Sequence, residues 1–264
     1  MVLSGLPVLG PTYTRDVAGR SYKTEAVVLR AFRFSEADNV LHLYTLERGR
    51  VGAMAKGVRR TKSRFGARLE PLSHVELVLH EGRGELQTVT GTDLIRPHQA
   101  VRDDPYRLGA GLVGAEAMLR LFTEQERNPR AFRALTRFLD GLDGLEPAGR
   151  TRPALEPLAL SFQLKLLWLS GYLPHMTGCA ECGATTGLVG YSPHAGGAVC
   201  SACNQDSIAL SPEGLKGIEA LLSLPLAEAD RAGLSARAAR EALQVVTASH
   251  EYHGGFQLRT LKSA

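Results

Sequence analysis

Four cysteines give the clearest chemical signal in this 264-residue sequence. Cys179 and Cys182 form one C-x2-C motif, and after a gap of 17 residues Cys200 and Cys203 form a second one. This spacing lets four thiolates surround one tetrahedral Zn²⁺ and leaves no coordination position for water. We therefore expect one structural Zn²⁺ per chain. The alternatives are unrelated buried thiols or a pair of redox dithiols.

A run of basic residues is the second chemical feature. From Arg50 to Arg68 there are seven Lys or Arg and no Asp or Glu. Such a run neutralises phosphates and releases counterions, which predicts salt-sensitive and sequence-tolerant binding of nucleic acid. Phe65 is a candidate for base stacking, with packing inside the fold as the alternative. The expected contacts are Arg50, Lys56, Arg59, Arg60, Lys62, Arg64 and Arg68.

Positive charge is concentrated toward the N-terminus. The whole chain has a net charge of +4 and a sequence pI of about 9.0. Residues 23–68 contain eleven Lys or Arg and four Asp or Glu, a balance of +7, so the remaining residues together carry −3. This asymmetry indicates that the N-terminal third of the chain binds a polyanion, either a nucleic acid or an anionic membrane surface.

The sequence has no pattern typical of an enzyme or of a membrane protein. It lacks a P-loop, a GxSxG elbow and an HExxH helix, so we expect no enzymatic activity and no small-molecule substrate. No apolar run approaches the ~20 residues of a membrane span, and the opening residues do not match a secretory signal. We expect a cytoplasmic, nucleoid-associated protein without membrane contact, and a disordered extension over residues 1–21.

A small β-barrel is expected to position the basic run. Five short strands without a long helix between them are typical of the OB fold, a common oligonucleotide-binding barrel, and an SH3-like barrel is the alternative. Residues 22–99 would form this domain, with the basic run in a loop where OB folds meet nucleic acid. Period-2 alternation predicts its strands over residues 25–34, 40–45, 51–58, 74–80 and 86–95.

Residues 100–264 are expected to form an all-α domain that carries the zinc-binding insert at about 176–206. The fold class is therefore α+β, an OB barrel followed by helices. One helix is predicted over residues 155–170, ending at Gly171, because its apolar residues share a face. Capping residues, three of them followed by proline, predict four more helix starts, at Asp104, Asn128, Ser211 and Ser235.

The sequence resembles the RecO family of bacterial DNA repair proteins. The resemblance covers roughly residues 22–260, and residues 1–21 depart from it. The order of barrel, helices and cysteine insert also agrees with the family. The segments that carry the resemblance are Glu25–Leu29 (EAVVL), Phe34–Asp38 (FSEAD), Thr45–Gly49 (TLERG), Ala55–Gly66 (AKGVRRTKSRFG) and Leu69–Pro71 (LEP).

This resemblance implies a recombination mediator that is not an enzyme. Such a protein binds single- and double-stranded DNA, promotes annealing and acts with RecR to load RecA onto DNA covered by single-strand-binding protein. The resemblance assigns DNA contact to the basic members of the matched motif, which are Lys56, Arg59, Arg60, Lys62 and Arg64.

The resemblance also implies binding of the acidic, hydrophobic C-terminal tail of the single-strand-binding protein. A site for this tail needs an apolar groove with a basic rim, which we expect in the helical domain. Lys165 lies near Phe162, Leu166 and Trp168 on one predicted helix and is a candidate for the rim. The favoured alternative is that this helix is wholly core and that Lys165 extends to water.

Three other protein classes share some of these features. An RNA-binding OB and zinc-ribbon protein of the translation machinery has similar charge and cysteines. An OB-containing nucleotidyl-transfer enzyme needs a K-x-D-G motif, and the segment Lys56–Arg59 (KGVR) lacks its acid. In a pure interaction scaffold the basic run would have no nucleic-acid role.

Overall fold

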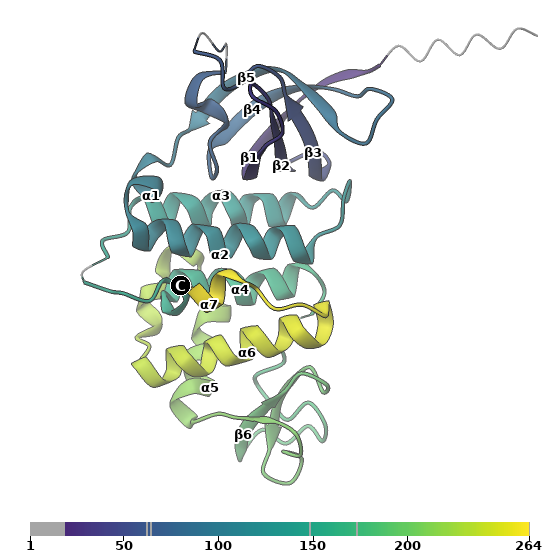
Figure 1. The fold of residues 1–264 in the computed structure, drawn as a ribbon. Coiled ribbons are helices and arrows are strands. Elements are labelled where there is room, and N and C mark those ends of the chain that lie inside the picture. Colours follow the sequence, from purple (N-terminus) through teal and green to yellow (C-terminus); the bar gives the residue numbers. More distant parts are fainter. Residues whose placement is uncertain (1–18, 62, 64, 148, 173, 264) are drawn as a thin grey trace, which may run out of the picture.

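The computed structural model describes residues 19–61, 63, 65–147, 149–172 and 174–263. The molecule is elongated, with a β-barrel at one end, helices in the middle and the cysteine-bearing insert at the other end (Figure 1). The expected extension over residues 1–21 lies outside the described residues except for residues 19–21, and Ser21 already belongs to the first strand.

The N-terminal part is a closed, OB-like barrel with the strand order β1-β2-β3-β5-β4. Neighbouring strands are antiparallel except β3 and β5, which pair in parallel over only two residue pairs, Ala53 with Gln87 and Met54 with Thr88. A 3₁₀ helix, η1 (Gly66–Leu69), precedes β4. The strands are β1 (Ser21–Arg33), β2 (Asn39–Thr45), β3 (Gly49–Ala55), β4 (His74–His80) and β5 (Gln87–Arg96).

Period-2 alternation explains the barrel interior. Leu41 and Leu43 of β2 and Val51 and Ala53 of β3 point inward, are at most 3% exposed and belong to one apolar cluster. The expectation of a third strand over residues 51–58 was too long, because β3 ends at Ala55. Gly57 has a φ of +70°, which breaks the extended backbone and places the following residues in a loop.

The rest of the chain is mainly helical, and the helix starts agree with the sequence. The side chains of Asp104, Asn128, Ser211 and Ser235 each accept a backbone hydrogen bond at a helix start. The helix expected over residues 155–170 is shorter, because a 3₁₀ turn precedes it. The elements are α1 (Gln99–Asp103), α2 (Pro105–Leu121), α3 (Pro129–Asp143), η2 (Pro153–Leu155), α4 (Pro157–Leu169), α5 (Pro212–Ser223), η3 (Leu226–Ala232), α6 (Ala236–Gly254) and α7 (Thr260–Ser263).

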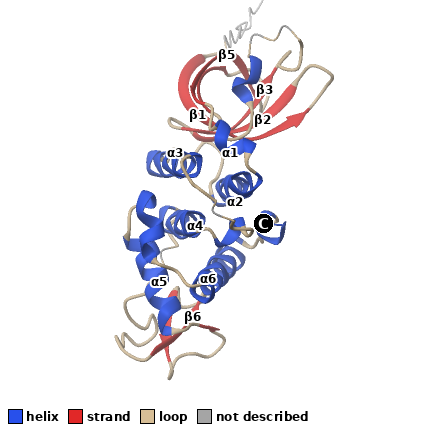
Figure 2. Cartoon of the chain, turned by 90° about the vertical axis from the view of Figure 1, so that its left-hand side faces the viewer, coloured by secondary structure: helices blue, strands red, loops and turns tan. Residues whose placement is uncertain are grey.

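Helices α2 and α3 lie side by side directly beneath the barrel, and α4, α5 and α6 follow toward the insert (Figures 1 and 2). Gly114 of α2 permits this packing, since a Cβ at this position would lie 2.4 Å from Cε1 of Phe138. Phe138 of α3 stacks on Phe162 of α4, with ring centroids 4.2 Å apart. No helix in the described part of the chain is long and apolar enough to cross a membrane.

The hydrophobic core of the helices extends into both neighbouring parts. From the barrel, Val27, Leu29 and Tyr44 pack into it, and from the insert Tyr191 does so. The insert contains a three-stranded sheet with the order β7-β6-β8, and its strands are β6 (Leu188–Ser192), β7 (Gly197–Cys200) and β8 (Ile208–Ala209). The barrel and the insert are thus both anchored to one helical core.

Candidate nucleic-acid interface and metal centre

The basic run forms a loop that is held against the turn between β1 and β2. The backbone N–H of Gly57 donates to Oδ1 of Asp38 over 2.7 Å, and the N–H of Arg59 donates to the carbonyl of Ala37 over 3.0 Å. Lys56, Arg59 and Arg60 are exposed on this loop. The structure therefore brings three of the expected contacts together on a positioned loop at the barrel surface.

The other four expected contacts are placed differently. Arg68 is exposed on η1, directly after the loop. Lys62 and Arg64 lie outside the described residues. Arg50 lies apart from the loop, at the start of β3, where its guanidinium donates to the carbonyl of Leu119 in α2 and lies 3.4 Å from a carboxylate oxygen of Glu124. These contacts favour a role for Arg50 at the junction of barrel and helices.

Phe65 is not available for base stacking. Its side chain is 1% exposed and belongs to the barrel core together with Leu69. Of the two alternatives for Phe65, base stacking is wrong and packing inside the fold is confirmed, because the chain at η1 folds the ring into the barrel interior. Phe34, on the turn that holds the basic loop, is 66% exposed and was not singled out from the sequence. The sequence signal for its exposure was its position at the end of a predicted strand, directly before the polar residues Ser35 and Glu36.

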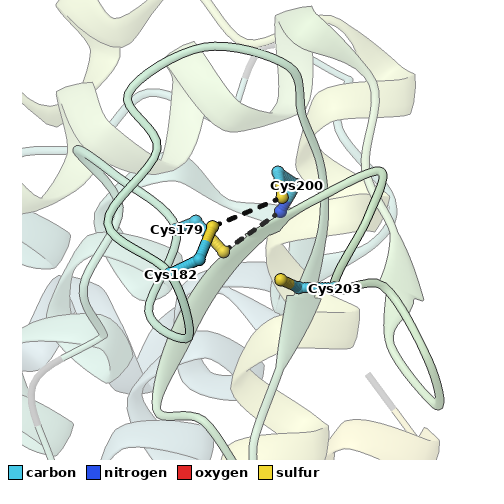
Figure 3. A group of neighbouring side chains, drawn as sticks. All are labelled: Cys179, Cys182, Cys200 and Cys203. Carbon is cyan, nitrogen blue, oxygen red and sulfur yellow. Dashed lines mark hydrogen bonds between the residues drawn. The ribbon is translucent and has the colours of Figure 1, made fainter.

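The four cysteines converge on one point in the insert (Figure 3). Their Sγ atoms all lie within 4.8 Å of one another, and those of Cys182 and Cys200 are 3.7 Å apart. Zn–S bonds of about 2.3 Å at the tetrahedral angle would separate two sulfurs by about 3.8 Å. The spacing fits a tetrahedral metal site made of thiolates, and all four cysteines are unpaired by disulfides.

Two tight turns present these thiols. The N–H of Gly183 donates to the carbonyl of Cys179, and Gly183 has a φ of +78°, which closes the first turn. In the second turn the N–H of Cys203 donates to the carbonyl of Cys200. Both turns follow from the two-residue spacing within each C-x2-C motif.

The polar groups around the sulfurs stabilise a thiolate. The N–H groups of Cys182 and Cys200 point at the Cys179 sulfur and lower the pKa of this thiol to about 6. Hydrogen bonding to the thiols of Cys182 and Cys200 raises the pKa of Cys203 to about 12. Four thiol sulfurs within 4.8 Å of one another are the donor set that a soft or borderline divalent cation prefers. The residues therefore fit a structural metal ion.

A groove lies in the helical part between α3, α4 and η3. Its volume is about 780 Å³, and Trp168, half exposed, and Leu226 line its apolar floor. Lys165 lines the groove, but its Nζ donates to the carbonyls of Leu221 and Leu222 at the end of α5, over 2.9 and 2.7 Å. The favoured interpretation of Lys165 as reaching to water was wrong, because these carbonyls lie within its reach. Burial lowers the pKa of its ammonium group.

Together these features define a two-part protein, an OB-like barrel with an exposed basic loop joined to helices that carry a four-thiol cluster. A family model described as "Recombination protein O N terminal" matches residues 20–98, and one described as "Recombination protein O C terminal" matches residues 102–262. The chain therefore belongs to the recombination protein O (RecO) family.

Relatives from several bacteria are similar over nearly the whole chain. A protein named DNA repair protein RecO from Rubrobacter xylanophilus is 40% identical over 236 residues, which cover 87% of this chain and 90% of the relative. Proteins of the same name from Nocardioides sp. and Frankia casuarinae are 38% and 40% identical, over 88% and 91% of this chain and 94% and 96% of the relatives.

Proposed function

We propose that this protein is a DNA-binding mediator of recombinational DNA repair. It binds single- and double-stranded DNA, promotes annealing of complementary strands and, with RecR, loads RecA onto DNA covered by single-strand-binding protein. Membership of the RecO family and the names of the relatives support this proposal. These steps need local concentration and charge screening of two polyanions, without covalent chemistry, so the proposal includes no enzymatic activity.

The observation that carries the proposal is the exposed basic loop on the OB-like barrel. Three cationic side chains, Lys56, Arg59 and Arg60, extend from a loop whose backbone is fixed by Asp38 and Ala37. A fixed backbone with long cationic side chains suits phosphate contacts that do not depend on sequence. We propose residues 22–99 as the DNA-binding domain, with Lys62, Arg64 and Arg68 as further DNA contacts, and residues 100–264 as the helical domain with its insert.

The test is salt-dependent binding to single-stranded DNA by a double variant, Arg59→Ala with Arg60→Ala. Two lost phosphate contacts should weaken binding of any sequence and flatten the slope of log affinity against log salt by about 1.4. The matched control, Arg152→Ala with Arg240→Ala, removes one exposed arginine of α6 and one near it, and should retain wild-type affinity and slope. If both double variants bind alike, the basic loop is not the DNA site.

The RNA-binding alternative is addressed by matched oligonucleotides. A repair protein of this family should bind a DNA strand at least as tightly as an RNA strand of the same sequence, because its phosphate contacts do not involve the 2′-hydroxyl. Clear preference for the RNA strand would favour the alternative.

We propose that the thiol cluster holds one structural Zn²⁺. The mutual distances of the four sulfurs, the 3.7 Å separation of Cys182 and Cys200 and the all-thiol donor set support this assignment. When bound, the ion would cross-link the two turns of the insert. It would leave no open position for a reacting water.

We propose the groove between α3, α4 and η3 as the site for the acidic, hydrophobic tail of single-strand-binding protein. Its apolar floor suits the hydrophobic side chains of such a tail. Arg130, Arg133 and Arg137 on α3 are exposed along one side, at helical spacing, and suit its carboxylates.

A labelled tail peptide titrated against the full chain tests this site. Arg133→Ala with Arg137→Ala should weaken peptide binding about tenfold, since each exposed ion pair contributes up to about 1 kcal/mol. The Arg152→Ala, Arg240→Ala control should bind as the wild type does. Equal peptide binding by both double variants would remove the groove from consideration.

A further inference from the structure

A second concentration of positive charge lies where the barrel meets the helices. A cleft of about 450 Å³ opens there, and the outer face of the barrel contributes Arg30, His42 and Arg50 to it. The opposite wall contributes Arg120 of α2 and Arg259 of the segment before α7. Four arginines from four separate parts of the chain therefore converge on one concavity.

Most of this positive charge is not neutralised within the protein. Arg30, Arg120 and Arg259 are exposed, and in the described part of the chain no carboxylate forms an ion pair with them. Glu116 is the carboxylate that lines the cleft. It accepts hydrogen bonds from the backbone N–H groups of Arg259 and Thr260 and from the Thr260 hydroxyl. Burial raises the pKa of Glu116, but these hydrogen bonds and the charge of Arg120 hold it below its usual range. Four guanidinium groups thus face one carboxylate among the residues that line the cleft, which leaves a net positive charge available to an anion.

The imidazole of His42 lies in the same positive electrostatic environment. Burial lowers the pKa of its imidazole, and the charges of Arg50 and Arg30 lower it further. Arg50 also has a buried Nε–H without a hydrogen-bond partner among the described residues. A group that accepts hydrogen bonds would satisfy this donor and reduce the repulsion among the cations.

The outer face of the barrel connects the cleft to the basic loop. In the strand register, Arg30 lies beside His42, and His42 lies beside Gly52. Because side chains alternate, the next outward residues on the same face are Phe32, Val40 and Met54, which are also neighbours in the register. Beyond them lie the β1–β2 turn and the loop that follows Ala55.

This connecting face has the composition of a surface that stacks bases. The guanidinium of Arg30 lies 4.2 Å from the ring centroid of Phe32, and the rings of Phe32 and His42 meet edge to face at 5.1 Å. Phe34 is exposed at the far end of the face. Aromatic side chains flanked by cations are a typical platform for single strands.

We propose that the arginine cleft is a second phosphate-binding site, which grips the same DNA strand after it has crossed the β1–β2–β3 face from the basic loop. This inference rests on the proposed DNA-binding function and adds the path that the DNA strand takes across the protein. Ala55 lies five positions after Arg50 in β3, about 17 Å away at the usual strand rise. At ~3.4 Å per phosphate, the axial spacing within one strand of a duplex, this length corresponds to about five phosphates, and to fewer in a more extended single strand. Together with the contacts at either end, the path fits the ~4–16 nucleotides that an OB fold occupies.

The experiment compares short and long single strands. A strand of about 20 nucleotides can reach both sites, whereas a strand of about four can fill only the basic loop. Arg120→Ala with Arg259→Ala should weaken binding of the long strand about tenfold and flatten its salt slope by about 1.4, corresponding to two lost phosphate contacts. Binding of the short strand should not change. Both arginines are exposed on the helical wall of the cleft, so the melting temperature of the double variant should match that of the wild type.

Two comparisons make the outcome decisive. If Arg120→Ala with Arg259→Ala binds the long strand as tightly as the Arg152→Ala, Arg240→Ala control does, the cleft is not a phosphate site. If the wild type binds no DNA of either length, the proposed function itself fails, which is a different result. If Arg59→Ala with Arg60→Ala weakens both lengths while the cleft variant weakens only the long one, both proposals stand.

Discussion

Two phenylalanines 31 positions apart show how strongly a residue's role depends on its surroundings. Phe65 lies in the most basic segment of the sequence but fills the barrel interior, whereas Phe34 stands exposed beside the same loop. Burial of an aromatic ring contributes to stability, and exposure of one beside cations makes it available to a nucleobase.

Substitution of these two residues should therefore have opposite effects. Phe65→Ala should lower the free energy of unfolding by about 3–5 kcal/mol through the cavity it leaves. Phe34→Ala should leave stability unchanged and weaken single-strand binding by about 1–3 kcal/mol, the contribution of one stacked base. Chemical denaturation and fluorescence anisotropy measure the two quantities. Weak binding and normal stability in Phe65→Ala would reverse our assignment of the two rings.

His250 should make stability depend on pH. It is 1% exposed, neither ring nitrogen has a hydrogen-bond partner among the described residues, and burial lowers its pKa to about 4. Between pH 6.5 and 4 the unfolded chain binds a proton that the folded chain does not, so stability falls as the pH falls through this window. The loss attributable to His250 approaches about 3 kcal/mol at pH 4.

The measurement is the free energy of unfolding between pH 7 and 4.5 for wild type and His250→Phe. The variant should lose less stability over this range, because it has no imidazole to protonate. His194→Gln removes an exposed histidine and is the control. Parallel curves for all three proteins would mean that His250 is not the group responsible.

At the scale of elements, the insert should depend on its metal. Cys200→Ser should reduce bound zinc from about one ion per chain to less than about half an ion per chain, because a site with three thiolates and a hydroxyl binds Zn²⁺ less tightly. Amide hydrogens of β6 to β8 should exchange faster, since the insert loses its cross-link. DNA affinity should be retained, because the barrel lies at the opposite end of the molecule (Figure 1).

Metal analysis and hydrogen exchange check this outcome, with Ser201→Ala as the neighbouring control. Full zinc content in Cys200→Ser, or wild-type protein that contains no zinc, would contradict the structural metal site.

The elements that could be predicted are those set by local patterns. Alternation defines β2 and β4, capping residues define the starts of α2 and α6, and C-x2-C spacing brings the sulfurs together. The burial of Phe65 and the contacts of Arg50 and Lys165 depend on residues far away in sequence. The short helices α1 and α7 depend on the same kind of contact. Such features follow from closure of the barrel and from packing of the helices, which no local pattern encodes.

At the scale of the whole molecule, the barrel and helices should unfold together. Val27, Leu29 and Tyr44 of the barrel are part of the helical core, so separating the two parts would expose a large apolar surface. Trp168, the single tryptophan, reports on the helices.

A cavity made only in the barrel interior tests this coupling. Leu41→Ala should destabilise the protein by about 2–5 kcal/mol, and the denaturation midpoint seen by Trp168 fluorescence should fall together with the midpoint seen by circular dichroism. A fluorescence midpoint that stays at the wild-type value would mean that the two parts unfold independently.

The hydrogen bonds between Glu116 and Thr260 join residues 144 positions apart, and they have a consequence for protein synthesis. Chains are made from the N-terminus, so the barrel and α2 leave the ribosome well before Arg259 is added. Until then Glu116 lacks its hydrogen-bond donors from Arg259 and Thr260, and one wall of the arginine cleft is missing. A nascent or prematurely released chain can thus present the basic loop but not the finished cleft. Contacts so distant in sequence also form slowly, which delays completion of the cleft further.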